Sequence, residues 1–167
     1  MVFEGIENKM NKKIKKLKKI YQATVDGGDS KIFHKKCDNI PNTLVIVESE
    51  GHRRFGGFTP IPWKSEEKEV WKKDPEMKTF VFSFDNKQIY YLKDSSKEAV
   101  YHFIDAGPGF GGGRDIAIEK NIFKDSNLST NHYSFDYYGE EYFCLSECGY
   151  DRKGKGIDYE VFQVIFD

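Results

Sequence analysis

Five glycines gather within seven positions near the middle of the chain, in the run GPGFGGG at residues 107–113. An apolar run at residues 100–104 leads into this cluster, and a shorter one at residues 116–118 follows it. Glycine lets the backbone adopt positive φ angles or approach a neighbour closely, where a side chain would clash. The stretch therefore predicts a strand, an irregular glycine loop and a second strand. The glycines expected to shape this turn are Gly107, Gly109, Gly111, Gly112 and Gly113.

The same run satisfies the G-x-G-x-x-G pattern of dinucleotide-binding loops. That function requires a helix directly after the loop, because the helix N-terminus holds the pyrophosphate. Residues 114–118, RDIAI, predict a strand instead, and Pro108 has no N–H to offer. No Lys-Ser or Lys-Thr pair follows, as a P-loop would need. We therefore favour a structural turn over a phosphate-binding loop.

Short runs rich in aromatic and β-branched residues fill most of the chain after residue 42, and aromatic residues make up 16% of the sequence. Their alternation predicts seven or eight strands. These lie at residues 43–49, 52–59, 79–84, 88–93, 100–104, 116–118, 142–147 and 157–166. Because long helices do not alternate with these strands, the predicted fold class is α+β, mainly β. The expected architecture is a two-sheet antiparallel β-sandwich flanked by short helices.

Some features refine this prediction. The runs 43–49 and 52–59 predict a hairpin, in which Gly56 and Gly57 mark a bulge or a close backbone approach. Residues 64–76 predict a charged surface excursion with Trp63 and Trp71 as apolar anchors. Residues 119–140 predict a long loop with short strand pieces, and residues 149–156 a charged excursion. In the last strand, opposite faces are apolar, as expected for a strand covered on both sides.

The N-terminal region predicts two helices. Met10, Ile14, Leu17, Ile20 and Tyr21 recur at helical spacing, which predicts a helix over residues 6–21 with seven lysines from Lys9 to Lys19. This gives a basic N-terminal helix at residues 1–19 and one domain at residues 20–167. We favour a helix whose lysines face water. Weak peripheral contact of these lysines with an acidic membrane stays an alternative. After a break at residues 26–29, a shorter helix is expected at residues 30–37.

Composition excludes several classes of protein. The net charge of −1 argues against a nucleic-acid binder, although residues 1–40 are basic and residues 125–167 acidic. No stretch approaches 18 apolar residues, so no transmembrane segment is expected. Three cysteines, an odd and low number, argue against a secreted disulfide scaffold. A soluble cytoplasmic protein is predicted, with its oligomeric state open.

No arrangement of catalytic residues stands out, so no catalytic residue, metal ligand or cofactor is predicted. His34 and Cys37, with Cys144 and Cys148, could form a zinc site, but buried cysteines are commoner. His102 is expected to face the core or to be hydrogen-bonded. A small enzyme, either a hydrolase or a peroxide scavenger that uses Cys37, remains the alternative function.

Several segments in a fixed order resemble the TLDc domain of the oxidation-resistance family, in its protist-type version. The segments are IYQATVDGGDSKIFHKKCDN, TLVIVESEGHRRFGGFT with Trp63 after it, KKDPEMKTFVFSF, GPGFGGGRDIAI and YEVFQV. They span about residues 20–164, whereas residues 145–156 depart from the family pattern. The resemblance implies a sandwich fold and a role in resistance to oxidative stress. It also implies a protein partner, the catalytic sector of the vacuolar proton-pumping ATPase (V-ATPase), and it supplies no catalytic residues. The candidate interaction residues are Asp151, Arg152, Lys153, Lys155 and Glu160.

Overall fold

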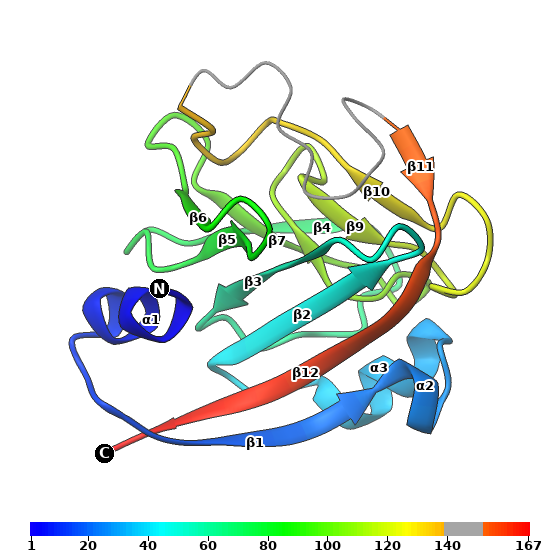
Figure 1. The fold of residues 1–167 in the computed structure, drawn as a ribbon, viewed down its shortest axis with the longest axis horizontal. Helices are drawn as coiled ribbons and strands as arrows, with labels where there is room; N and C mark the ends of the chain where they lie inside the picture. The colour runs from blue at the N-terminus through cyan, green and yellow to red at the C-terminus, as the bar shows by residue number, and fades with distance from the viewer. Residues whose placement is uncertain (139–151) are drawn as a thin grey trace.

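A computed structural model describes residues 1–138 and 152–167 as two facing antiparallel sheets with three short helices in the described ranges (Figure 1). The helices are α1 (Val2–Met10), α2 (Ala23–Asp26) and α3 (Ser30–Cys37). Sheet 1 has the order β1 (Ile14–Gln22), β12 (Gly156–Phe166), β2 (Thr43–Ser49), β3 (Arg54–Thr59), β5 (Phe80–Ser83), β6 (Gln88–Tyr91). Sheet 2 has the order β11 (Arg152–Gly154), β10 (Leu128–Thr130), β9 (Ile116–Ile118), β8 (Gly109–Phe110), β7 (Glu98–His102), β4 (Val70–Lys73). The predicted fold class, a mainly β sandwich with short helices, is confirmed.

Two apolar clusters hold these layers together. The larger cluster lies between the sheets and joins residues of both, such as Val45 and Tyr159 of sheet 1 with Phe110 and Ile116 of sheet 2. The indole of Trp63 is 1% exposed within it and donates from Nε1 to Thr43 Oγ1 at 2.8 Å. The smaller cluster lies on the outer face of sheet 1, beneath α1. Sheet 1 is therefore apolar on both faces, which explains the near-continuous apolar runs of its strands.

The central strands confirm the hairpin predicted for residues 43–49 and 52–59. Strands β2 and β3 pair without a register shift from Thr43 opposite Thr59 to Glu48 opposite Arg54, and β5 pairs with β6. The glycine pair in β3 therefore marks a close approach and no bulge. A Cβ at Gly56 would overlap the backbone carbonyl of Val45, and one at Gly57 would overlap the Phe110 ring.

Strand β12 crosses sheet 1 between β1 and β2 and pairs with both. Tyr159 and Val161 belong to the cluster between the sheets, whereas Phe162 and Val164 belong to the outer cluster. The two apolar faces predicted for this strand are confirmed, because each side meets a different layer.

Helix α3 matches the predicted short helix at residues 30–37. The Asp29 carboxylate caps it by accepting from the Lys31 N–H at 3.0 Å. Phe33 and Cys37 are completely buried, as expected for the inward face. The chain reverses before this helix at Gly27, whose φ of 113° suits glycine.

The predicted helix over residues 6–21 is wrong after Met10. Helix α1 ends at Asn11, which has the left-handed φ of 51°, and residues 14–22 form β1 at the edge of sheet 1. The register against β12 shifts twice, between Ile14 and Lys16 and between Lys19 and Tyr21. These bulges place half-buried Ile14, Leu17 and Ile20 at every third residue, so the apolar residues of the strand have a spacing close to that of a helix. The predicted boundary between residues 19 and 20 falls inside this strand.

Two charged excursions contain strands that we did not predict. Strand β4 lies within residues 64–76, and its Trp71 is 39% exposed, so this residue is not the buried anchor that we expected. Strand β11 lies within residues 149–156. The strand predicted at residues 142–147 lies outside the described residues. In the described part of the chain, no helix is both long and apolar enough to cross a bilayer.

Candidate functional site

The glycine loop turns the chain between β8 and β9, and these strands are antiparallel. Gly111 has a φ of 84°, and a Cβ there would overlap the carboxylate of Asp115. A Cβ at Gly112 would overlap Glu98, and one at Gly113 would overlap Tyr133. A turn and then β9 follow, so the loop does not have the helix that a dinucleotide site requires.

The N–H groups of this loop are occupied by the protein itself. Gly107 donates to the carbonyl of Ile118 at 2.8 Å, and Gly111 to the carbonyl of Ala99 at 2.9 Å. Gly112 donates to Ser134 Oγ at 2.7 Å. Because these donors already have internal acceptors, they cannot cradle a phosphate without breaking the loop.

Asp115 ties residues 133–137 to the glycine loop. Its buried carboxylate accepts hydrogen bonds at 3.0–3.2 Å from the N–H groups of Tyr133, Ser134 and Phe135 and from the Tyr137 hydroxyl. Burial raises the pKa of Asp115, and these four donors oppose that effect. The donors compensate for removing a carboxylate from water, so loop and segment form one ordered unit.

A polar hollow of about 210 Å³ lies beside this unit. Gly113 and Arg114 line it from the loop, Glu119 from the end of β9, and Lys153 from β11. Arg114 Nη2 donates to Glu119 Oε1, and the guanidinium lies 4.9 Å from the centre of the Tyr101 ring. These contacts hold Arg114 in place beside the inner strands of sheet 2. We call this feature the β11 hollow.

The predicted interaction residues do not form one cluster. Lys153 is exposed and lines the β11 hollow, and Lys155 Nζ lies 3.9 Å from Asp125 Oδ1. Glu160 lies on β12 and lines a different hollow on sheet 1, where it pairs with Lys19. Arg152 begins β11, and Asp151 lies outside the described residues. The sequence analysis missed Arg114 and Glu119, which are separated by the short strand β9 and carried no recognisable pattern.

The buried thiol and histidine at the end of α3 do not form a catalytic pair. Cys37 is completely buried, and burial raises the pKa of its thiol, so the reactive thiolate is disfavoured. His34 Nδ1 lies 2.7 Å from Asp38 Oδ1, and its Nε2 lies 2.9 Å from the carbonyl oxygens of Phe103 and Ala106. Carbonyl oxygens only accept, so Nε2 carries hydrogen and is not a free base or metal ligand.

Ser65 completes a cluster that resembles a catalytic triad in composition but not in order. Its hydroxyl donates to Asp38 Oδ2, while His34 contacts the other carboxylate oxygen. A triad needs the histidine next to the serine, because the imidazole removes the hydroxyl proton. Here Asp38 lies between them, so the geometry does not activate Ser65.

His102 faces the core, as one of the two sequence alternatives predicted. It is 2% exposed, packs against Trp63, and neither ring nitrogen has a hydrogen-bond partner among the described residues. Burial lowers its pKa to about 4, so the imidazole is neutral at physiological pH. In residues 1–138 and 152–167, three or more His, Cys, Asp or Glu residues nowhere gather as a metal site would require. Cys144 and Cys148 lie outside these ranges.

Comparison with known proteins gives a family match. The sequence model of the TLDc domain matches residues 2–165, which is nearly the whole chain and includes α1 and β1. The chain matches no curated protein.

Proposed function

The chain belongs to the TLDc domain family, and from this membership we propose that it is a regulatory interaction protein that binds the V-ATPase. The proposed partner is the catalytic sector of the pump, which faces the cytoplasm, so the protein would act there. Control of the pump would be its contribution to resistance to oxidative stress. The observation that carries this proposal is the family match over residues 2–165.

We propose the β11 edge of sheet 2 as the surface that contacts the pump. Among the described residues, strand β11 pairs with β10 on one side and is the last strand of the sheet, with no strand on its other side (Figure 1). A free strand edge can recruit a partner strand through main-chain hydrogen bonds. Lys153 and the β11 hollow supply charged side chains beside that edge. Charged groups of this kind steer association and select the partner.

Affinity purification of the tagged protein from cells, followed by mass spectrometry, tests the proposal. We expect subunits of the pump's catalytic sector to be enriched over an unrelated sandwich protein. The double variant Lys153→Glu, Lys155→Glu should reduce this enrichment, because it reverses the charge beside β11. The matched control is Lys72→Glu, Lys73→Glu on β4, the opposite edge of the same sheet. Absence of pump subunits from the native sample would overturn the proposed partner, and equal loss in both variants would overturn the proposed surface.

A further inference from the structure

Among the described residues, four strands end the two sheets, and β1 is the longest of them. It has nine residues, whereas β6, β4 and β11 have four, four and three. Strand β1 pairs with β12 on one side and, in the described part of the chain, has no strand on the other. A long edge presents a row of main-chain N–H and C=O groups to which an extended segment of another protein can add.

The regular part of this edge lies between the two bulges of β1. Four consecutive pairs join it to β12, from Lys16 opposite Ile165 to Lys19 opposite Phe162. Within the described ranges, no group outside β12 is hydrogen-bonded to the main chain of residues 15–19. We call the outer side of residues 15–19 the β1 edge. It is long enough for a partner strand of about four or five residues.

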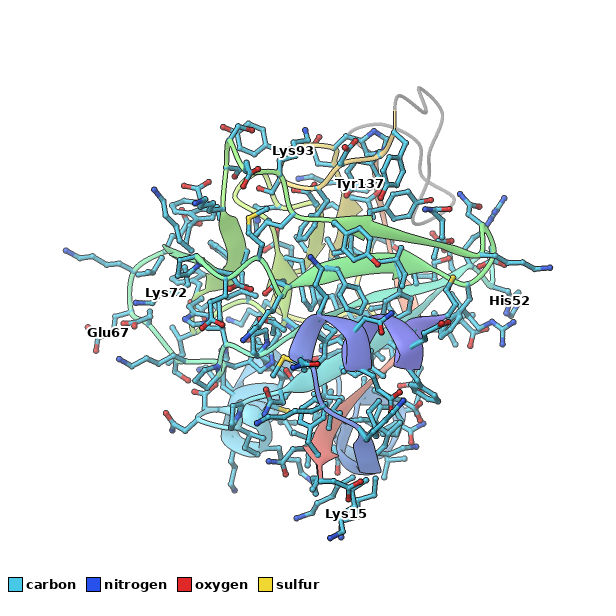
Figure 2. All side chains as sticks on the ribbon, turned by 90° about the vertical axis from the view of Figure 1, so that its left-hand side faces the viewer. Lys15, His52, Glu67, Lys72, Lys93 and Tyr137 are labelled. Carbon is cyan, nitrogen blue, oxygen red and sulfur yellow. The ribbon has the colours of Figure 1, made fainter. Side chains whose placement is uncertain are left out.

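Lysines fill the β1 edge, and most of them have no partner. Lys15, Lys16 and Lys18 make no hydrogen bond or ion pair with any described residue. Lys19 is the exception, because it pairs with Glu160 on β12. In Figure 2, Lys15 projects away from the rest of the protein. Three free cations therefore lie side by side along an open strand edge.

The acids near β1 leave these three cations unmatched. The β12 residues opposite residues 16–19, FQVI, carry no charge. Apart from Glu160, the acids lie at the two ends of the strand: Glu4, Glu7 and Asp167 near Lys13, and Asp158 bonded to Gln22. Each end is about 10 Å along the strand from residues 16–19. Charges farther apart than about 8 Å are largely screened in physiological salt, so the middle of the β1 edge stays positive.

The directions of the side chains favour a strand as the partner of this edge. Successive side chains of a strand point to opposite faces, so Lys16 and Lys18 share one face, and Leu17 and Lys19 share the other. Lysines on both faces flank a segment that pairs with the edge, whereas a membrane would meet only one face. The net charge of −1 argues against a nucleic acid, whose binding depends on phosphate neutralisation over a wide surface.

We propose that the β1 edge binds an extended acidic segment of a partner protein, which adds to sheet 1 as a further strand. Two acidic side chains at alternate positions face Lys16 and Lys18, and the apolar residue between them lies beside Leu17. Opposite charges on neighbouring strands stabilise the pairing. A second copy of this chain is disfavoured at the edge, because its own lysines would face these lysines.

Fluorescence anisotropy of a labelled peptide, measured with the whole protein, tests this proposal. The probe has the sequence EVEVEVE, is capped at both ends, and is used below the concentration at which it self-associates. We expect one saturable site, whose affinity falls roughly tenfold when salt is raised from about 50 mM to about 500 mM. The neutral peptide QVQVQVQ and the basic peptide KVKVKVK should bind more weakly. Equal binding of the acidic and basic peptides would overturn the proposal.

Two N-methylated forms of EVEVEVE separate strand pairing from charge alone. One carries methyl groups on the glutamate nitrogens, and the other carries them on the valine nitrogens. Alternate N–H groups of a strand point to the same side, so only one of the two sets faces β1. We expect one modified peptide to lose binding and the other to keep it. Equal affinity of the two modified peptides would show that no strand is added, and would overturn the proposal.

Variants place the peptide on this edge. The double variant Lys16→Glu, Lys18→Glu should weaken EVEVEVE roughly tenfold or more, because two attractive pairs become repulsive. The matched control is Lys72→Glu, Lys73→Glu on β4, which also changes two exposed lysines of an edge strand and should leave the affinity unchanged. Equal weakening in the two variants would overturn the assignment to β1. The peptide assay contains no pump subunit, so its result is separate from the test of the proposed V-ATPase partner.

Vesicles of anionic phospholipid distinguish a membrane contact from a strand partner. We expect EVEVEVE to bind whether or not the protein sediments with vesicles. If EVEVEVE does not bind, while vesicles retain the native protein and release the Lys16→Glu, Lys18→Glu variant, the lysines contact a membrane and the proposal is overturned.

Discussion

Replacing Asp115 by asparagine tests whether one carboxylate orders the segment beside the glycine loop. The N–H groups of Tyr133, Ser134 and Phe135 and the Tyr137 hydroxyl donate to it at 3.0–3.2 Å. Asparagine has nearly the same shape but keeps one acceptor oxygen, and its NH₂ group would meet another donor. The substitution therefore weakens several charge-assisted hydrogen bonds and leaves a buried donor unpaired.

The expected loss follows from these contacts. A hydrogen bond to a charged group contributes about 1.5–3 kcal/mol, and an unpaired buried donor costs about 1–3 kcal/mol. The amide oxygen of the new asparagine still accepts, so part of the hydrogen-bond contribution is kept. We therefore expect Asp115→Asn to lower the free energy of unfolding by about 3 kcal/mol. For a chain of this size, that corresponds to a fall in Tm of roughly 6–12 °C.

Thermal unfolding and amide hydrogen exchange measure the two consequences separately. The amides of Tyr133, Ser134 and Phe135 should exchange slowly in the native protein and lose protection in Asp115→Asn. The matched control is Asp125→Asn, an exposed acid whose nearest cation is 3.9 Å away, which should change the free energy by less than about 0.5 kcal/mol. If Asp115→Asn kept the native Tm and the native protection, the carboxylate would not be the anchor of this segment.

Three further predictions concern buried groups. His102 takes up a proton near pH 6.5 in the unfolded chain but only near pH 4 in the folded protein. The free energy of unfolding should therefore fall by about 3 kcal/mol as the pH is lowered from 6.5 to 4. Urea unfolding of His102→Phe should show a smaller change in the free energy of unfolding over the same pH range. The same pH dependence as in the native protein would contradict the assignment. In the Cys144→Ser, Cys148→Ser background, Cys37 should react with a thiol reagent only after unfolding, and Cys37→Ser should leave any peroxide turnover unchanged. Rapid reaction in the native state would show that the thiol is accessible. Gly111→Ala should cost roughly 2 kcal/mol or more, because φ is 84° and the new methyl group overlaps a buried carboxylate; a native Tm would contradict this.

The strands that the sequence predicted best lie in the middle of sheet 1. Strands β2, β5 and β12 carry apolar residues on two faces or in clear alternation, and β2 and β5 are buried along most of their length. This pattern of apolar residues is local and strong, so it predicts these strands correctly. Helix α3 was predicted for the same reason, since its cap and its buried face lie within nine residues.

The edges of both sheets were predicted poorly. Strand β1 was interpreted as a helix because two bulges change its period, and its lysines suit an exposed sheet edge as well as a helix surface. Figure 2 shows Lys15 of this strand pointing away from the body of the molecule. Strands β4 and β11 also lie at the two edges of sheet 2, where a strand pairs with one neighbour in place of two among the described residues. Charged residues are tolerated there, so the alternation that identifies a strand is weak.

The candidate sites depended still more on the tertiary structure. The sequence indicated that the glycines shape a turn, but not that their N–H groups meet Ser134, Ala99 and Ile118. It named Lys153 and Glu160 together, although they line different hollows on different sheets. It showed no sign of the apolar hollow on the outer face of sheet 1, which Leu17 of β1, Leu44 of β2 and Phe162 of β12 line together.

By itself, the sequence determined that this chain forms a mainly β sandwich with a glycine turn, and its motifs indicated the family. Those properties follow from side-chain alternation and backbone freedom, which act over a few residues. Only the tertiary structure decided which polar groups meet at the β11 hollow and which apolar surface α1 leaves open. Such contacts join residues far apart in the chain, and they depend on how two sheets and a helix pack, which no local pattern records.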